Sequence, residues 1–224
     1  LCHPLTGPRA KNSSLKKEFG SKNISRHLVV WQKDLGRGNY GRVYLATFRN
    51  TQVAVKEALG PQTTKESIDE AKLLSQLSHP RILCLLGICC EPNTEPLLII
   101  TEFMPKGSLL DFLKTEEGKA FSIDDLIKIL SQICEGMAYL EEHKVVHNDL
   151  RAANVLVDED NSVRVADFGL AKILRCDNRD INIRLRFKNL YPLNHSKYGQ
   201  KWLFAKTQTV YVSHMKKVMK LMVA

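Results

Sequence analysis

The residues best suited to chemistry stand in one short polar segment, His147-Asn148-Asp149-Leu150-Arg151-Ala152-Ala153-Asn154, which is followed by Asp167-Phe168-Gly169. A carboxylate such as Asp149 can accept a proton from a hydroxyl group. Asn154 and Asp167 offer the oxygen ligands that Mg²⁺ prefers. Transfer of a phosphoryl group to a hydroxyl needs both functions. Each motif alone is common by chance, so the prediction depends on the order and spacing of the others.

A glycine-rich run lies about 110 residues upstream, with the pattern G-x-G-x-x-G-x-V. Glycine lets the backbone approach a phosphate closely and direct its N–H groups at the anion. A plain hairpin or a dinucleotide-binding turn also produces this pattern. A dinucleotide-binding turn should be followed by a helix. Here the glycine-rich run is followed by alternating apolar residues, which are typical of a β-strand. We therefore expect a phosphate-binding loop between two strands, formed by Gly36, Arg37, Gly38, Asn39, Tyr40, Gly41, Arg42 and Val43.

A lysine and a glutamate complete the candidate site. Lys56 ends the run Val53-Ala54-Val55-Lys56, 15 residues after Gly41. A lone lysine or glutamate here would ordinarily be a solvated surface charge. Lys56, however, follows a phosphate-type loop and precedes a predicted helix that carries Glu70 on its inner side. A cation that contacts phosphates needs an anionic partner to hold its flexible stem, so we expect Lys56 and Glu70 to pair.

The elements expected around these residues form a small sheet followed by a helical region. Alternating apolar residues from Leu28 to Val55 predict three short antiparallel strands. A helix over 64–77 follows, with Thr63 and Glu66 placed as a capping box. The runs Ile82–Leu86 and Leu97–Thr101 predict two further strands. The periodic stripe of Leu126, Leu130, Ile133, Met137 and Leu140 predicts a helix of about 20 residues from Ser122, and two very short strands are expected at Val155–Val157 and Val163–Val165.

Composition indicates a globular protein in a reducing compartment. No apolar run approaches the ~18 residues of a membrane-spanning helix, and no signal peptide is evident at Leu1. The six cysteines form no C-x-x-C pair, so buried free thiols and a cytoplasmic location are expected. Residues 172–224 carry a net charge of +10, whereas residues 1–171 carry −1. The basicity therefore belongs to a tail, and we expect no nucleic-acid partner.

With these motifs in order, residues 35–170 resemble a protein kinase. Arg151-Ala152-Ala153-Asn154 is similar to the tyrosine kinases, and to the Src family of non-receptor kinases in particular. The resemblance implies an α+β kinase fold with a five-stranded antiparallel N-lobe, helix C and a partial helical C-lobe. It also implies transfer of the γ-phosphoryl group of ATP to tyrosine in protein substrates, with Mg²⁺ or Mn²⁺ as the metal ion.

The resemblance assigns roles to individual residues. The catalytic set would be Asp149 as the base, Lys56, Glu70 and Arg151. Asn154 and Asp167 would hold the metal. Thr101 would be the gatekeeper, and Glu102, Phe103 and Met104 the hinge that pairs with adenine. The purine would lie between Leu35, Val43, Ala54 and Leu156. An apolar spine linking the lobes would consist of Leu74, Leu85, His147 and Phe168.

The expected domain organisation has four parts. Residues 1–6, Leu-Cys-His-Pro-Leu-Thr, are similar to the last strand of an SH2 domain, which implies an upstream SH2 domain with phosphotyrosine ligands. Residues 7–27 are expected to be a linker, 28–174 a kinase domain truncated after Asp167-Phe168-Gly169, and 175–224 a divergent basic tail. Membrane association is expected only through parts outside this chain.

The sequence departs from the kinase pattern in two places. Asn148 replaces the arginine that in the family pairs with a phosphorylated residue of the activation loop, which puts that mode of activation in doubt. Residues 175–224 contain no Ala-Pro-Glu motif, and the match to the family stops near Leu174. Two hypotheses therefore stand: an active tyrosine kinase, or a truncated form that binds nucleotide or a partner without catalysis.

Overall fold

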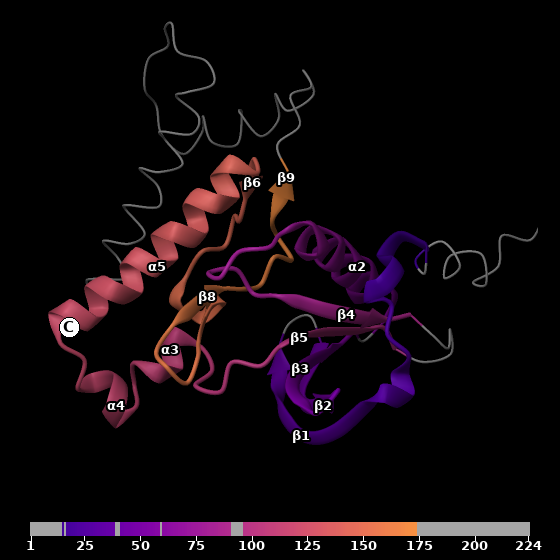
Figure 1. The fold of residues 1–224 in the computed structure, drawn as a ribbon, viewed down its shortest axis with the longest axis horizontal. Coiled ribbons are helices and arrows are strands. Elements are labelled where there is room, and N and C mark those ends of the chain that lie inside the picture. Colours follow the sequence, from indigo (N-terminus) through magenta and orange to yellow (C-terminus); the bar gives the residue numbers. More distant parts are fainter. Residues whose placement is uncertain (1–14, 16, 39–40, 59, 91–95, 174–224) are drawn as a thin grey trace, which may run out of the picture.

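The computed structural model describes residues 15, 17–38, 41–58, 60–90 and 96–173. A five-stranded sheet with one helix lies at one end of the molecule, and a mainly helical part lies at the other (Figure 1). In chain order the elements are η1 (Gly20–Lys22), η2 (Arg26–Leu28), β1 (Val29–Gly38), β2 (Gly41–Phe48), β3 (Thr51–Glu57), α2 (Pro61–Gln76), β4 (Leu85–Cys89), β5 (Leu98–Glu102), α3 (Leu109–Phe112), α4 (Glu116–Lys119), α5 (Ile123–Glu142), β6 (Val145–Val146), η3 (Ala152–Asn154), β7 (Val155–Val157), β8 (Val163–Val165) and β9 (Lys172–Ile173).

The expected five-stranded antiparallel sheet is confirmed, with strand order β1-β2-β3-β5-β4. Val43 stands opposite Lys56, and Ala54 stands opposite Thr101. Because successive side chains of a strand point to opposite faces, these four residues share one face of the sheet. The other face buries a separate apolar cluster that includes Ala46, Val53, Val55, Leu98 and Ile100.

Part of the segment before the sheet packs onto it. Phe19 and Ile24 are buried in the two main apolar clusters. The amide of Ile24 donates to the carbonyl of Ile88 over 2.9 Å, which adds a bridge at the edge of β4. Gly87 accommodates this contact, because a Cβ atom there would lie 2.0 Å from the side chain of Ile24. Residues within the expected linker are therefore packed against the small sheet.

The helix expected at 64–77 is present as α2, but its predicted cap is wrong. The helix begins at Pro61, and its N-cap is Gly60, which has no side chain to cap it. Proline at the first helical position needs no hydrogen bond from its nitrogen. Thr64 instead donates its hydroxyl to the carbonyl of Gly60 over 2.7 Å. Thr63 lies one turn too deep in the helix to act as its N-cap.

The strand expected at Ile82–Leu86 begins three residues later, at Leu85. The cause is a second partner for the preceding backbone. Val165 of β8 donates to the carbonyl of Arg81 and accepts from the amide of Leu83, each over 2.9 Å. Residues 81–83 therefore bridge to the helical part before the chain enters the sheet.

The long helix expected from Ser122 is confirmed as α5. The hydroxyl of Ser122 accepts from the amide of Asp125, and the carboxylate of Asp125 accepts from the amide of Ser122. This reciprocal capping box was not predicted from the sequence. The strands expected at 155–157 and 163–165 are confirmed as the antiparallel pair β7–β8. The short elements α3, α4, β6 and β9 were not expected, since two to four residues give no periodicity to detect.

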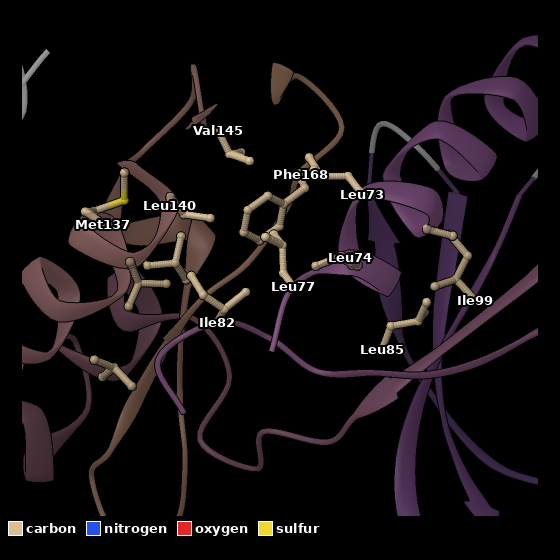
Figure 2. Packing of buried hydrophobic residues seen from close by; sticks show 14 of the residues in the cluster. Leu73, Leu74, Leu77, Ile82, Leu85, Ile99, Met137, Leu140, Val145 and Phe168 are labelled. Carbon is tan, nitrogen blue, oxygen red and sulfur yellow. The ribbon is translucent and has the colours of Figure 1, made fainter. Parts of the chain in front are cut away.

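One apolar cluster joins the sheet to the helical part (Figure 2). Leu74 of α2 and Leu85 of β4 belong to it, as do Phe168 and residues of α5 such as Leu140. All four are at most 2% exposed. The core thus extends continuously between the two ends of the molecule.

The cysteines divide into two kinds. Cys89 and Cys90 are both buried, as expected. Burial raises the pKa of Cys89 to about 11, which keeps it protonated at neutral pH. Cys84 and Cys134 are exposed, contrary to the expectation of buried thiols, because they face outward from otherwise apolar segments. Cys2 and Cys176 lie outside the described residues. Within the described ranges, no helix is both long and apolar enough to cross a membrane.

Candidate active site

The glycine-rich run forms the hairpin between β1 and β2. Gly36 and Gly41 have φ angles of +136° and +140°, which other residues rarely adopt. A Cβ atom at position 41 would also lie 2.0 Å from the carbonyl oxygen of Glu57. Asp34 accepts a hydrogen bond from the Gly36 amide over 2.8 Å and pairs with Arg42 over 3.5 Å. Asn39 and Tyr40 lie outside the described residues.

Lys56 and Glu70 are held together by an ion pair. The Nζ atom of Lys56 lies 2.6 Å from Oε2 of Glu70, which connects β3 to α2. The Lys56 side chain is 20% exposed and that of Glu70 is 8% exposed. A lysine held this way presents its ammonium group from a fixed position at the sheet face. This is the face that Val43, Ala54 and Thr101 share.

The predicted adenine-binding residues lie on five strands, β1, β2, β3, β5 and β7. Val43, Ala54 and Thr101 are partly buried, whereas Leu35 is 41% exposed. Leu156 comes from β7 in the helical part and packs with Met104, Leu83 and Ala166. Residues from both parts of the molecule therefore contribute to this region.

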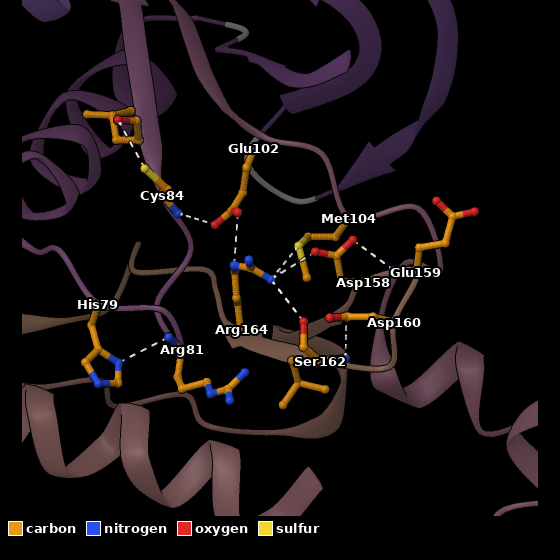
Figure 3. Close-up of polar contacts among 12 residues, drawn as sticks. His79, Arg81, Cys84, Glu102, Met104, Asp158, Glu159, Asp160, Ser162 and Arg164 are labelled. Atoms are coloured by element: carbon orange, nitrogen blue, oxygen red, sulfur yellow. Dashed lines mark hydrogen bonds and ion pairs between the residues drawn. The ribbon is translucent and has the colours of Figure 1, made fainter. Parts of the chain in front are cut away.

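The side chains of Glu102 and Met104 are both engaged within the protein (Figure 3). Glu102 accepts a hydrogen bond from the Cys84 amide over 2.7 Å and pairs with Arg164 over 2.9 Å. Arg164 also contacts Asp158 over 3.1 Å and the sulfur of Met104 over 3.6 Å. Burial raises the pKa of Glu102, while the Cys84 amide and Arg164 oppose that shift. A ligand at this segment would therefore meet its backbone groups.

The polar loop is organised around two buried side chains. His147 is completely buried, and its Nε2 lies 2.9 Å from the carbonyl of Ala166. Its Nδ1 accepts from the amide of Asp149 over 3.3 Å, so the ring is neutral with the proton on Nε2. Burial lowers the pKa of His147, which favours this neutral form.

Asn154 ties the loop to the segment that carries Asp167. Its Nδ2 donates to both the carbonyl and Oδ2 of Asp149, each over 2.8 Å. Its own carbonyl accepts from the amide of Ala166 over 2.8 Å. Asp149 also pairs with Arg151 over 3.3 Å, where Arg151 is 57% exposed. The carboxylate of Asp149 is therefore oriented by two neighbours and remains partly accessible.

Asp167 and Phe168 differ in how deeply they are buried. Asp167 has a φ angle of +60°, a conformation uncommon outside glycine, asparagine and aspartate. Phe168 is 1% exposed, and its ring centroid lies 4.9 Å from that of His147. With Leu74 and Leu85 also buried, all four expected spine residues lie in the interior. The Asp167 side chain is partly buried, and its Oδ1 accepts a hydrogen bond from the Gly169 amide over 3.4 Å.

The structure thus brings the predicted residues together in two groups. One is Lys56 with Glu70, and the other is Asp149 with Arg151, Asn154 and the backbone next to Asp167. Arg164, Asp158 and Cys84, which surround Glu102, were not predicted from the sequence. An arginine between two valines in a strand looks like an outward surface charge, so no pattern identified it.

Comparison with known proteins matches residues 29–194 to the family described as protein tyrosine and serine/threonine kinase, so the match extends beyond Leu174, where it was expected to stop. The chain is 41% identical over 172 residues to tyrosine-protein kinase SPK-1 of Girardia tigrina, covering 76% of the chain and 35% of that protein. The chain belongs to the family of protein tyrosine and serine/threonine kinases. This kinase chain is also 38% identical over 184 residues to Src64B of Drosophila melanogaster, covering 79% of the chain and 33% of that relative.

A third relative is tyrosine-protein kinase Fgr of Mus musculus, 39% identical over 178 residues, covering 78% of the chain and 34% of that protein. The resemblance to Src-type tyrosine kinases is therefore confirmed, as is the α+β kinase fold with a partial helical lobe. The kinase chain spans about a third of the length of each of these three relatives.

Proposed function

We propose that this chain carries the site of a non-receptor tyrosine kinase, which transfers the γ-phosphoryl group of ATP to tyrosine in protein substrates. The observation that carries the proposal is the network around Asn154. It holds the carboxylate of Asp149 by a 2.8 Å hydrogen bond and binds the backbone next to Asp167. The proposed proton acceptor and one proposed metal ligand are thereby joined, and the second proposed ligand, Asp167, directly follows Ala166, an arrangement that supports phosphoryl transfer.

Each residue then has a definite part. Asp149 accepts the proton of the tyrosine hydroxyl as the oxygen attacks phosphorus, and Arg151 helps to hold its carboxylate. Lys56, fixed by Glu70, contacts the α- and β-phosphates of ATP. The loop from Gly36 to Val43 covers the phosphates with backbone N–H groups. Adenine pairs with the backbone of Glu102 and Met104 beside Thr101, between the apolar residues Leu35, Val43, Ala54 and Leu156.

The residues present fit Mg²⁺ or Mn²⁺. Asn154 supplies an amide oxygen and Asp167 a carboxylate, the donor types of hard cations that bind through few protein ligands and phosphate oxygens. The side-chain N–H groups of Asn154 donate to Asp149, which leaves the side-chain amide oxygen of Asn154 available as a ligand for a cation. When bound, the ion would neutralise charge on the phosphate oxygens.

The test is the substitution Asp149→Asn. It removes the proton acceptor but keeps the size of the side chain, so we expect peptide phosphorylation to fall by at least 10²-fold, the lower end of general-base contributions. ATP affinity should change little. Asp124→Asn, an exposed aspartate in the first turn of α5, is the matched control. Phosphotransfer by Asp149→Asn at the wild-type rate would refute the proposal.

A second candidate is a non-catalytic form that binds nucleotide or a partner. The observation in its favour is the exposed apolar side of α5, where Ile123 is 75% exposed and Ile127 is 54% exposed. Thermal denaturation with and without ATP and Mg²⁺, paired with a phosphotransfer assay, separates the two candidates. Stabilisation without transfer supports the non-catalytic form, whereas robust transfer rules it out.

The wider organisation of the protein is part of the proposal. Residues 1–6, similar to the end of an SH2 domain, support an upstream SH2 domain that binds phosphotyrosine, followed by the linker 7–27, the kinase region 28–174 and the basic tail 175–224. The proposed location is cytoplasmic. Residues 1–14 and 174–224 lie outside the described part of the structure. Mass spectrometry of the native protein provides the test, since peptides that extend an SH2 sequence upstream of Leu1 are expected.

A further inference from the structure

Asn148 occupies a strained and specific position between His147 and Asp149. Its φ angle is +65°, in the left-handed region that asparagine tolerates better than most residues. In this conformation its side-chain Nδ2 lies 2.9 Å from the carbonyl oxygen of Leu170 and 3.5 Å from that of Val146. The amide thus joins the loop of the proposed base to the residue that directly follows Asp167-Phe168-Gly169.

The contact completes a set of links around Asp167. On the N-terminal side of Asp167, the amide of Ala166 donates to the carbonyl of Asn154, and the carbonyl of Ala166 accepts from Nε2 of His147. After it, the amide of Ala171 donates to the carbonyl of Phe168 over 3.0 Å, and Lys172 pairs with Val146 in the β6–β9 ladder. That ladder has only two residue pairs. Leu170 lies just before this short ladder, so the hydrogen bond from Asn148 adds a further link to the same segment.

We propose that Asn148 is a positioning residue that holds Asp167 in place by donating a hydrogen bond to the Leu170 carbonyl. This inference rests on the proposed function of Asp149 and Asp167. A carboxamide is neutral, and the nitrogen of Asn148 is already engaged with backbone carbonyls. It therefore has no charge to pair with a phosphoryl group, in contrast to an arginine at this position. The Asp167 segment is thus held by a neutral hydrogen bond and not by an ion pair.

The experiment is amide hydrogen exchange of residues 168–173 in the 224-residue chain, with two variants. Asn148→Asp keeps the shape but places an acceptor against the Leu170 carbonyl. Asn148→Gly keeps the left-handed backbone but removes the donor. A single hydrogen bond affects local opening by roughly 3- to 10-fold, so exchange should accelerate by about that factor in both variants. Asn50→Asp and Asn50→Gly are the controls, because Asn50 has a φ of +62° in the exposed β2–β3 turn.

A second readout is affinity for a non-hydrolysable ATP analogue with and without Mg²⁺. Both Asn148 variants should lose part of the affinity gained with Mg²⁺, while the affinity without the metal stays at the wild-type value. Wild-type exchange in either Asn148 variant would overturn the proposal, since the donor would then be dispensable. If the wild-type chain binds no nucleotide at all, the proposed function fails, whereas the exchange measurement still decides the role of Asn148.

Discussion

The Lys56–Glu70 pair joins β3 to α2, and the proposed function gives the same contact a second role in binding ATP. Both side chains are largely removed from water and are 2.6 Å apart. Removing one partner of such a pair leaves a buried charge without compensation. The resulting loss of stability is much larger than the net stability that the intact pair contributes. The contact also sets the direction in which Lys56 presents its ammonium group. Stability and ATP affinity are therefore expected to respond together when it is broken.

The substitution Glu70→Gln tests this coupling. Glutamine keeps an oxygen that can accept from Lys56, so we expect a loss of about 1–3 kcal/mol in the free energy of unfolding. ATP affinity should also fall, because Lys56 is no longer held by an opposite charge. Denaturant unfolding and ATP titration provide the measurements. Asp69→Asn, at an exposed position on the same helix, should leave both values unchanged. A normal ATP affinity in Glu70→Gln would contradict the assigned role of the pair.

Residue chemistry was the part most accessible from sequence. Asp149, Asn154 and Asp167 stand in short motifs, so their types and spacing are visible without a structure. The partners of Glu102 were not visible, because Cys84 and Arg164 reach it through tertiary contacts 18 residues before it and 62 residues after it. The hydrogen bond of Asn148 to Leu170 likewise depends on a backbone angle that sequence does not report.

At the scale of elements, long periodic segments were predictable and their ends were not. Helix α5 follows from its apolar stripe, and β7 and β8 follow from short valine-rich runs around a polar turn. The start of β4 was placed too early because residues 81–83 bond to Val165, a partner far along the chain. The cap of α2 was misassigned because Pro61 allows the helix to begin before Thr63.

The capping box of α5 gives a quantitative prediction. Ser122→Ala removes the hydroxyl that caps the Asp125 amide, which should cost about 1 kcal/mol. For a chain of this size that corresponds to a decrease of roughly 2–4 °C in Tm. Ser131→Ala, at an exposed position inside the same helix, is the control and should leave Tm unchanged or slightly higher. Equal Tm values for Ser122→Ala and the wild type would show that the box contributes little.

At the scale of the whole molecule, the sheet and the helical part share one core. The cluster that contains Leu74 and Leu85 from the sheet side also contains Leu140 and Phe168 from the other side. Two regions that share a buried core are expected to unfold together, because neither can lose its packing without exposing the other. Backbone bonds between Leu83 and Val165 reinforce this connection.

Phe168→Ala tests whether the shared core makes unfolding cooperative. Removing a buried phenylalanine should cost about 3–5 kcal/mol, because its ring contacts His147 and fills the space between the two parts. If the parts are energetically one unit, circular dichroism and tryptophan fluorescence should shift together in a single transition. Leu170→Ala, two residues away and 50% exposed, should have little effect. Two separated transitions in the wild type would mean that the sheet and the helical part fold independently, and the role of Phe168 would then be confined to its own side.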